Sequence, residues 1–434
     1  HLLNHTSGIR DYLMLAYLKG LRNDDFYTDE ELMQWLVNQT DLNFVPGEEY
    51  VYSNSGYWLL GQIVKEASGK NMADFAQEAI FEPLGMEDTH FHNDHTAIVK
   101  NRASGYTPSG PNSYAISMTT LDMIGDGGIF TTINDIKKWD DAFYESEVLS
   151  KEFWTMMTRQ GVLNNGEEID YASGLEISEY RGLKTIRHGG AFVGFRADLL
   201  RFPEQKLTIA VFANRADGDP WAKADEVADI LLAESFKDQE GAAEEMAAGP
   251  EKTEFINLSR KQLEGFTGHY WNPKDAFSRE IVLENDTLRY VRNERSRSTL
   301  VPVGQNEFKI INIPVDVRVQ FVEAYGTQMA VTVEDDAPSI FVEYEPVSYQ
   351  AEALKPFVGT YYSQELDVEY VLKLEEGKLM LYLNGNPTAP LDPIMKNVFS
   401  NDYYGVLTFA EKQGVITEFR LAAGRVKNLL FTKR

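Results

Sequence analysis

The spacing of apolar residues changes along the chain, and it divides the sequence into a helix-rich part and a strand-rich part. Within residues 1–233, Leu32, Trp35 and Leu36 recur at helical spacing. They follow Thr28-Asp-Glu-Glu31, in which the Thr hydroxyl and the Glu carboxylate form a capping box at a helix start. The pattern therefore predicts a helix that begins directly after Thr28.

Further elements follow from the same reasoning. We expect a buried helix over residues 57–67 ended by Gly69, a helix over 71–81, a helix opened by Thr132, and a helix over 221–236 with Val227, Ile230, Leu231 and Leu232 on its apolar side. The apolar runs 197–202 and 207–213, joined by Pro203-Glu-Gln-Lys206, predict a strand hairpin. Helices around a hairpin indicate an antiparallel sheet flanked by helices.

The strand-rich part contains an internal repeat with a period of 91 residues. Leu263-Glu-Gly-Phe-Thr-Gly-His-Tyr270 aligns with Leu354-Lys-Pro-Phe-Val-Gly-Thr-Tyr361 at this offset. The later matches pair Leu288 with Leu379, Leu300 with Leu391, Pro302 with Pro393 and Phe308 with Phe399. The alternation within each repeat predicts one small antiparallel barrel per repeat, and barrels of this size are usually filled by side chains.

These patterns give an α+β fold class with four segments. Residues 1–236 form an antiparallel sheet flanked by helices, residues 237–254 form an acidic linker, and residues 255–347 and 348–434 form two β-barrel-like modules.

The formal net charge of −26, from 67 acidic and 41 basic residues, argues against nucleic acid as a partner because phosphate backbones are also negative. No apolar run reaches the roughly 20 residues that a membrane-spanning helix needs. The absence of cysteine removes disulfides, thiolate metal sites and a Cys nucleophile. Composition leaves the compartment open between cytoplasm, periplasm and the exterior, and it leaves a homo-oligomer open.

Three short motifs carry a family resemblance. They are HLLNHTSG at 1–8, Tyr52-Ser-Asn54, and His188-Gly-Gly190, with FEPLGM at 81–86 and GGIFTTINDIKKW at 127–139 beside them. In this order they resemble the penicillin-recognising serine hydrolases, which include class C β-lactamases, D-aminopeptidases, esterases and D,D-peptidases. The resemblance covers residues 1–233 and implies the β-lactamase-like fold. The two barrels more weakly resemble the lipocalin-like modules of some D-aminopeptidases.

The resemblance implies catalytic roles for Tyr52 and Asn54, with Ser53 beside the substrate. Tyr52 would be the general base, although an unperturbed phenol has a pKa near 10 and needs a cationic neighbour to act at pH 7. Asn54 would hydrogen-bond the acyl side chain of the substrate. The alternative is that these residues only line a turn before a helix.

His188, Gly189 and Gly190 occupy the place of the Lys-Thr-Gly motif of β-lactamases. The glycines would let the strand backbone approach a ligand closely, and the N–H of Ala191 would be one oxyanion donor. Because histidine is mostly neutral at pH 7 where lysine is charged, we expect a peptide or ester substrate rather than a penicillin. A purely structural role of His188 is the alternative.

Two other sets of residues could carry chemistry, a histidine cluster and a motif serine. His90, His92 and His95 around Asp94 could ligate a metal, but a solvated loop of histidines is the preferred interpretation, so no metal or cofactor is expected. Ser7 is not expected to be a nucleophile, because it lacks a glycine elbow.

The family's nucleophile is the serine of a Ser-x-x-Lys motif, and no Ser or Thr in the 434 residues has Lys three positions later. We therefore expect a serine hydrolase with an N-terminally incomplete catalytic domain, acting through an acyl-enzyme on D-amino-acid amides or esters and inactive as this chain alone. Two alternatives remain: an inactive relative that binds peptide or cell-wall fragments, and a module whose barrels bind a small apolar ligand.

Overall fold

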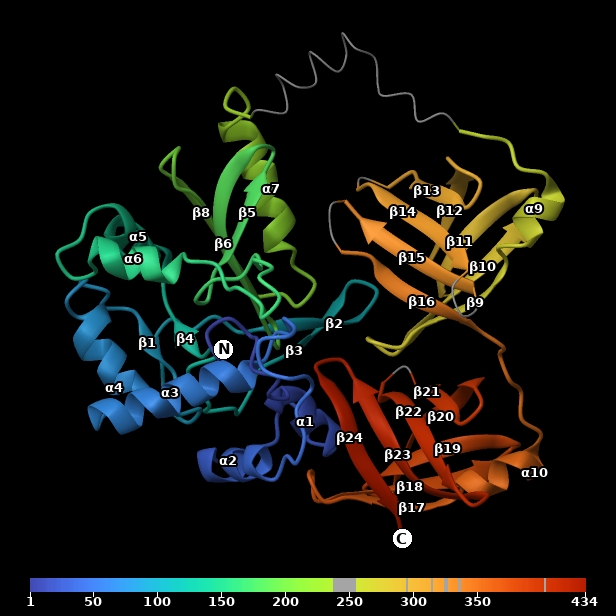
Figure 1. Cartoon of the computed structure of the whole chain (residues 1–434). Helices are drawn as coiled ribbons and strands as arrows, with labels where there is room; N and C mark the ends of the chain where they lie inside the picture. The colour runs from blue at the N-terminus through green and yellow to red at the C-terminus, as the bar shows by residue number, and fades with distance from the viewer. Residues whose placement is uncertain (237–254, 294–295, 314, 324–326, 335–336, 402) are drawn as a thin grey trace. The chain divides into compact units, whose positions relative to one another are not determined.

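The computed structural model describes residues 1–236, 255–293, 296–313, 315–323, 327–334, 337–401 and 403–434 (Figure 1). The chain forms two compact units. The first contains residues 1–236 with two short segments, Gln364–Val368 and Gly424–Asn428, and the second contains the remaining described residues. The predicted linker at 237–254 lies outside the described residues.

The centre of the first unit is a four-stranded antiparallel sheet with strands in the order β5 (Glu176–Tyr180), β6 (Leu183–Phe192), β7 (Phe195–Phe202) and β8 (Leu207–Ala213). The predicted hairpin is the β7–β8 pair, in which Phe202 lies opposite Leu207. Two ribbons complete the strands of this unit: β1 (His90–Phe91) with β4 (Ile129–Phe130), and β2 (Tyr106–Gly110) with β3 (Ser113–Ile116).

The helices of this unit lie beside the sheet and below it in the view of Figure 1. They are α1 (Tyr12–Leu18), α2 (Asp29–Val37), α3 (Asn54–Ser68), α4 (Met72–Ala76), α5 (Ile133–Tyr144), α6 (Lys151–Met157) and α7 (Pro220–Leu231). Leu200 and Phe202 of β7 pack with α7. Arg201, which points to the opposite face of β7, donates from Nε to Asp140 of α5 over 2.8 Å. Helices therefore cover both faces of the sheet, and the predicted antiparallel sheet flanked by helices is confirmed.

Local capping signals position several helices as the sequence predicts. Thr28 and Glu31 form the reciprocal capping box at the start of α2, and the hydroxyl of Thr132 accepts from the N–H of Asp135 at the start of α5. Gly69 ends α3 with φ of +72°, a left-handed conformation that favours glycine.

Three predictions about helices are wrong in detail. The segment 71–81 is not one α-helix, since α4 ends at Ala76 and Gln77–Phe81 forms a π-helical turn. Helix α3 is not buried all round, because Trp58 is buried while Ile63 is half exposed.

The apolar face predicted for residues 221–236 is correct only at Leu232 and wrong at Val227, Ile230 and Leu231. Ala224, Ala228 and Leu232 pack on the sheet, whereas Ile230 and Leu231 are exposed. Because alanine side chains are small, Ala224 and Ala228 let α7 lie close to the sheet. A pattern of large apolar residues therefore does not identify the packing face of this helix.

The second unit contains two closed antiparallel barrels. The strands of the first are β9 (Gly268–Asn272), β10 (Phe277–Glu284), β11 (Thr287–Asn293), β12 (Ser296–Pro302), β13 (Glu307–Ile311), β14 (Val317–Glu323), β15 (Thr327–Val333) and β16 (Ser339–Tyr344). Those of the second are β17 (Gly359–Ser363), β18 (Val368–Glu375), β19 (Lys378–Leu383), β20 (Asn386–Met395), β21 (Val398–Asn401), β22 (Gly405–Lys412), β23 (Val415–Ala423) and β24 (Val426–Lys433). Short helices α9 (Arg260–Glu264) and α10 (Ala351–Leu354) precede the barrels.

The repeat positions are equivalent in the two barrels. Tyr270 and Tyr361 are both fully buried, and each donates its hydroxyl to the carbonyl four residues earlier, that of Phe266 or Phe357. The other matched apolar pairs are buried as well: Leu263 with Leu354, Leu288 with Leu379, Leu300 with Leu391, and Phe308 with Phe399. The prediction of two small barrels is confirmed.

Candidate active site

The segment before α3 brings Tyr52 close to strand β6. The ring centroid of Tyr52 lies 6.3 Å from that of His188 and 6.1 Å from that of Tyr171. His5, from the first motif, stacks on Tyr52 with ring centroids 4.0 Å apart. Residues from all three sequence motifs therefore meet in one cluster of rings, which we call the ring cluster: His5, Tyr52, Tyr171 and His188.

His188 is held in one tautomer by its two contacts. Its Nδ1 lies 2.7 Å from the carbonyl oxygen of Gly189, and a carbonyl oxygen can only accept a hydrogen bond. The proton of a neutral imidazole is therefore on Nδ1, and Nε2 accepts from the hydroxyl of Tyr171 over 3.0 Å. Burial raises the pKa of Tyr171 far above its usual value, so this hydroxyl remains a donor.

Asn54 is the first residue of α3 and is engaged by a buried carboxylate. Its backbone N–H and its side-chain Nδ2 both donate to Oδ2 of Asp11, over 2.8 and 2.7 Å. The other oxygen of Asp11 caps α1 by accepting from the N–H of Met14. Asp11 thus fixes the amide of Asn54 relative to α1, and this contact was not anticipated from the sequence.

The environment of Tyr52 favours the protonated phenol. Burial raises its pKa, and the carboxylates of Asp126 and Asp11 act in the same direction, whereas Arg425 opposes them. Arg425 belongs to the Gly424–Asn428 segment of the same compact unit, and its guanidinium lies 4.6 Å from the centroid of the Tyr52 ring. This cation alone does not bring the pKa of Tyr52 down to the value of a free phenol.

The two glycines of the His-Gly-Gly motif lie where a Cβ atom could be accommodated. A Cβ added to Gly190 would meet Ala197 Cβ at 3.5 Å, and one added to Gly189 would meet nothing closer than 3.6 Å, which are ordinary contacts. Packing among the described residues therefore does not require either glycine. Ala191 follows them, is exposed, and lines a cavity of about 250 Å³ together with Leu13, Leu121, Phe192 and Arg196.

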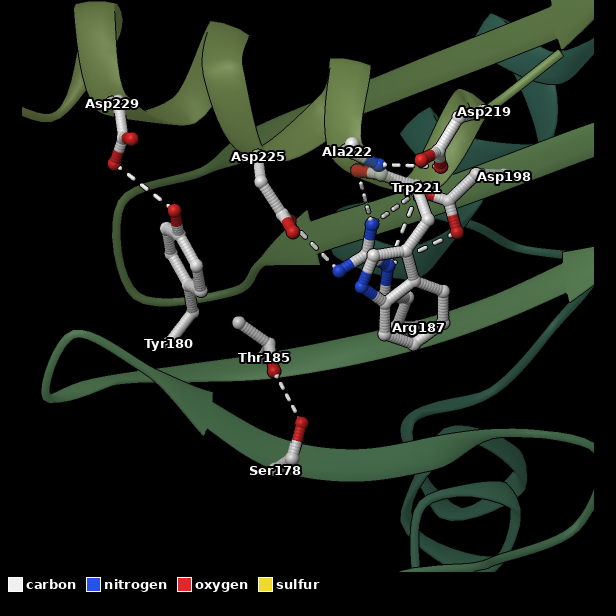
Figure 2. Close-up of polar contacts among 10 residues, drawn as sticks. All are labelled: Ser178, Tyr180, Thr185, Arg187, Asp198, Asp219, Trp221, Ala222, Asp225 and Asp229. Carbon is white, nitrogen blue, oxygen red and sulfur yellow. Dashed lines mark hydrogen bonds and ion pairs between the residues drawn. The ribbon is translucent and has the colours of Figure 1, made fainter. Parts of the chain in front are cut away.

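The opposite side of β6 is anchored by a buried ion network. Figure 2 shows the Arg187 guanidinium between Asp198 of β7 and Asp225 of α7. Its Nε and Nη2 donate to Asp198, its Nη1 donates to Asp225 over 2.8 Å, and its Nη2 also donates to the carbonyl oxygen of Trp221. Because neighbouring side chains on a strand point to opposite faces, this network holds β6 from behind while His188 points into the ring cluster.

The histidines of the 90–95 segment do not form the solvated loop expected from the sequence. His92 is buried and stacks on Phe130 with ring centroids 4.2 Å apart. His95 contacts Asp122, with 2.8 Å between Nδ1 and Oδ2. Within the described ranges, no group of three or more His, Cys, Asp or Glu side chains could hold a metal ion.

The two motif serines are enclosed. Ser7 is buried and its hydroxyl accepts from the N–H of Ile9, while the buried Oγ of Ser53 has no partner among the described residues. Among the described residues, neither hydroxyl contacts a base in the ring cluster, and Ser53 reaches that cluster through its backbone N–H, which donates to Nδ1 of His5.

The model of the family described as Beta-lactamase matches residues 1–234, more than half of the chain. The chain belongs to the beta-lactamase family. Among the described residues, no helix is both long enough and apolar enough to cross a membrane.

Its relatives include a penicillin-binding protein and D-aminopeptidases. Penicillin-binding protein 4* of Bacillus subtilis (strain 168) is 27% identical over 372 residues, covering 82% of this chain and 77% of that protein. A D-aminopeptidase of Gluconobacter oxydans (strain 621H) is 26% identical over 231 residues, covering 53% of this chain; the match spans only 44% of that relative's length. A solved structure of an octameric penicillin-binding protein homologue from Pyrococcus abyssi has a TM-score of 0.48 at 22% identity, covering 79% of this chain and 77% of that one.

Sequence reasoning missed Tyr171 and Asp11. Tyr171 lies in an irregular segment without a motif, so only the fold reveals its contact with His188. Asp11 directly precedes the apolar run of α1, and this N-cap signal could have been recognised.

Proposed function

We propose that this chain is the β-lactamase-related part of a serine hydrolase that transfers acyl groups to water through an acyl-enzyme. Its substrates would be D-amino-acid amides, peptides or esters rather than β-lactams. The nucleophile would be the serine of a Ser-x-x-Lys motif outside these 434 residues, and this chain alone would be inactive. The observation that carries the proposal is the ring cluster, in which the ring centroids of Tyr52 and His188 lie 6.3 Å apart, on the strand that continues through Gly189 and Gly190 to Ala191.

In this proposal the serine Oγ attacks the substrate carbonyl carbon and its proton passes to Tyr52. The N–H of Ala191 donates to the oxygen that becomes negative, and the proton then leaves with the amine or alcohol as the tetrahedral intermediate collapses. Water repeats the sequence on the acyl-enzyme and releases the acid. Asn54, fixed by Asp11, would orient the acyl group, with Gly189 and Gly190 lining its path.

The raised pKa of Tyr52 means that its proposed role as a base needs a further cation beside it. A phenol whose pKa is raised by burial cannot take a proton at neutral pH. A lysine placed beside it would stabilise the phenolate by direct charge interaction, which is what the Ser-x-x-Lys motif would supply. His188, which can be neutral, gives a weaker anchor for a β-lactam carboxylate than a permanent cation.

Turnover by the protein that carries such a segment tests this proposal. We expect release of nitroaniline from D-alanine p-nitroanilide in preference to the L-isomer and to a chromogenic cephalosporin. Tyr52→Phe should lower kcat by about 10²–10⁴-fold, the usual contribution of a general base. Tyr50→Phe, a neighbouring phenol without an assigned role, should stay within about threefold of the parent protein.

Absence of turnover of D-amino-acid amides, peptides and esters by the segment-bearing protein would contradict the hydrolase proposal. Binding of D-amino-acid peptides without turnover would then favour the alternative, an inactive relative that binds peptide or cell-wall fragments.

A further inference from the structure

His5 binds the backbone on both sides of Tyr52. The N–H of Val51 donates to the carbonyl oxygen of His5 over 3.0 Å, and the N–H of Ser53 donates to its Nδ1 over 3.1 Å. Tyr52, the residue between these two donors, packs its ring on the imidazole with a centroid distance of 4.0 Å. His5 therefore contacts Tyr52 itself through its ring, and it binds the residues on either side, Val51 through its backbone carbonyl and Ser53 through Nδ1.

The surroundings of His5 fix its own conformation. Its side chain is buried and lies between the rings of Tyr52, Tyr57 and Tyr171, with centroid distances of 4.0, 5.1 and 4.7 Å. Its φ of +54° lies in the left-handed region, which is uncommon for a residue other than glycine. Gly8 closes the same loop with φ of +73°, and a Cβ there would lie only 2.2 Å from the carbonyl oxygen of Phe44. The loop is thus held in one shape.

The imidazole is uncharged and incompletely satisfied. Because Nδ1 accepts from Ser53, the proton of the neutral ring lies on Nε2, which is buried and has no hydrogen-bond partner among the described residues. A buried donor without an acceptor costs about 1–3 kcal/mol of stability. A histidine at this position is therefore not explained by folding stability alone.

We propose that His5 is a positioning residue for Tyr52, holding the phenol at its place in the ring cluster through the amides of Val51 and Ser53. This inference rests on the proposed role of Tyr52 as general base. His5 itself exchanges no proton in the reaction; it sets where the Tyr52 hydroxyl lies.

Two variants separate positioning from general stability. His5→Asn keeps an acceptor oxygen near the place of Nδ1, and asparagine tolerates positive φ. His5→Ala removes both the acceptor and the ring. In the segment-bearing protein, His5→Ala should lower kcat by about 10²-fold with little change in KM, because small misplacement of a catalytic group has effects of this size. His5→Asn should stay within about threefold of the parent protein.

A spectroscopic readout needs no turnover and uses this chain as it is. After incorporation of 3-fluorotyrosine, the ¹⁹F resonance of position 52 is assigned by its loss in Tyr52→Phe. We expect one narrow resonance in the parent chain and in His5→Asn, and a broadened or split one in His5→Ala. The inference is overturned if His5→Ala leaves this resonance and kcat unchanged, or if His5→Asn behaves like His5→Ala. Loss of turnover in every variant, parent included, would instead count against the proposed function, while the resonance still decides the role of His5.

Discussion

At the scale of single residues, buried polar atoms without a hydrogen-bond partner lie in the ring cluster and beside Tyr52. His5, Ser53 and Asp126 each have a buried polar atom without a partner among the described residues. Burial raises the pKa of Asp126 to about 7, and the Tyr12 hydroxyl donates to its other oxygen over 2.8 Å. Polar groups left in this state near Tyr52 are typical of a site whose remaining contacts come from a ligand or another segment.

The unusual state of His5 predicts a pH dependence of stability. Burial lowers its pKa from 6.5 to about 3, so between these values the unfolded chain binds a proton that the folded chain does not. The free energy of unfolding should therefore fall with decreasing pH by about 1.4 kcal/mol per unit more in the parent chain than in His5→Asn. Urea unfolding of both proteins from pH 7 to pH 4 measures this difference, and parallel stability curves would contradict it.

At the scale of elements, strand β6 joins the two sides of the site. Its residues alternate between the ring cluster, reached by His188, and the buried ion network around Arg187. The Arg187 guanidinium binds the carboxylates of Asp198 and Asp225 and also contacts Trp221, through its carbonyl oxygen and its ring (Figure 2). Because these partners belong to β7 and α7, the guanidinium fixes β6, β7 and α7 together. The position of the His-Gly-Gly strand therefore depends on a contact made behind it.

Removal of the Arg187 side chain should accordingly lower the free energy of unfolding substantially. Arg187→Ala leaves Asp198 buried without its partner, and breaking a buried pair in this way typically costs about 3–5 kcal/mol of unfolding free energy. Arg181→Ala, which breaks the more exposed pair between the β5–β6 turn and Asp229 of α7, should cost no more than about 1 kcal/mol. Chemical denaturation of the two variants provides the comparison, and equal losses would contradict the assigned role of the network.

How much the sequence predicts depends on how local the signal is. Caps at Thr28 and Thr132 involve residues three positions apart, and they place α2 and α5 correctly. The 91-residue repeat predicts equivalent burial at Tyr270 and Tyr361, because both copies fold alike. The packing face of α7 and the pairing of Tyr171 with His188 depend on distant partners, and local patterns carry no signal for either.

At the scale of the whole molecule, the chain combines a beta-lactamase family unit with two closed barrels. The barrel interiors are filled by aromatic and aliphatic side chains such as Phe308, Phe321, Phe399 and Phe419, which are all buried. A ligand-carrying role for the barrels therefore has little support, and the chemistry is expected in the first unit. The role of Tyr52, Asn54, His188 and Ala191 as the site of acyl transfer remains a prediction.

In the proposed mechanism, this chain supplies the base and one oxyanion donor but not the nucleophile. Intact mass after treatment with a fluorophosphonate probe tests it most directly, on the 434-residue chain and on the protein that also carries a Ser-x-x-Lys segment. We predict no adduct on the 434-residue chain, and one probe mass on the segment-bearing protein at the serine of that motif. An adduct on a serine within the 434 residues, or none on either protein, would contradict the account.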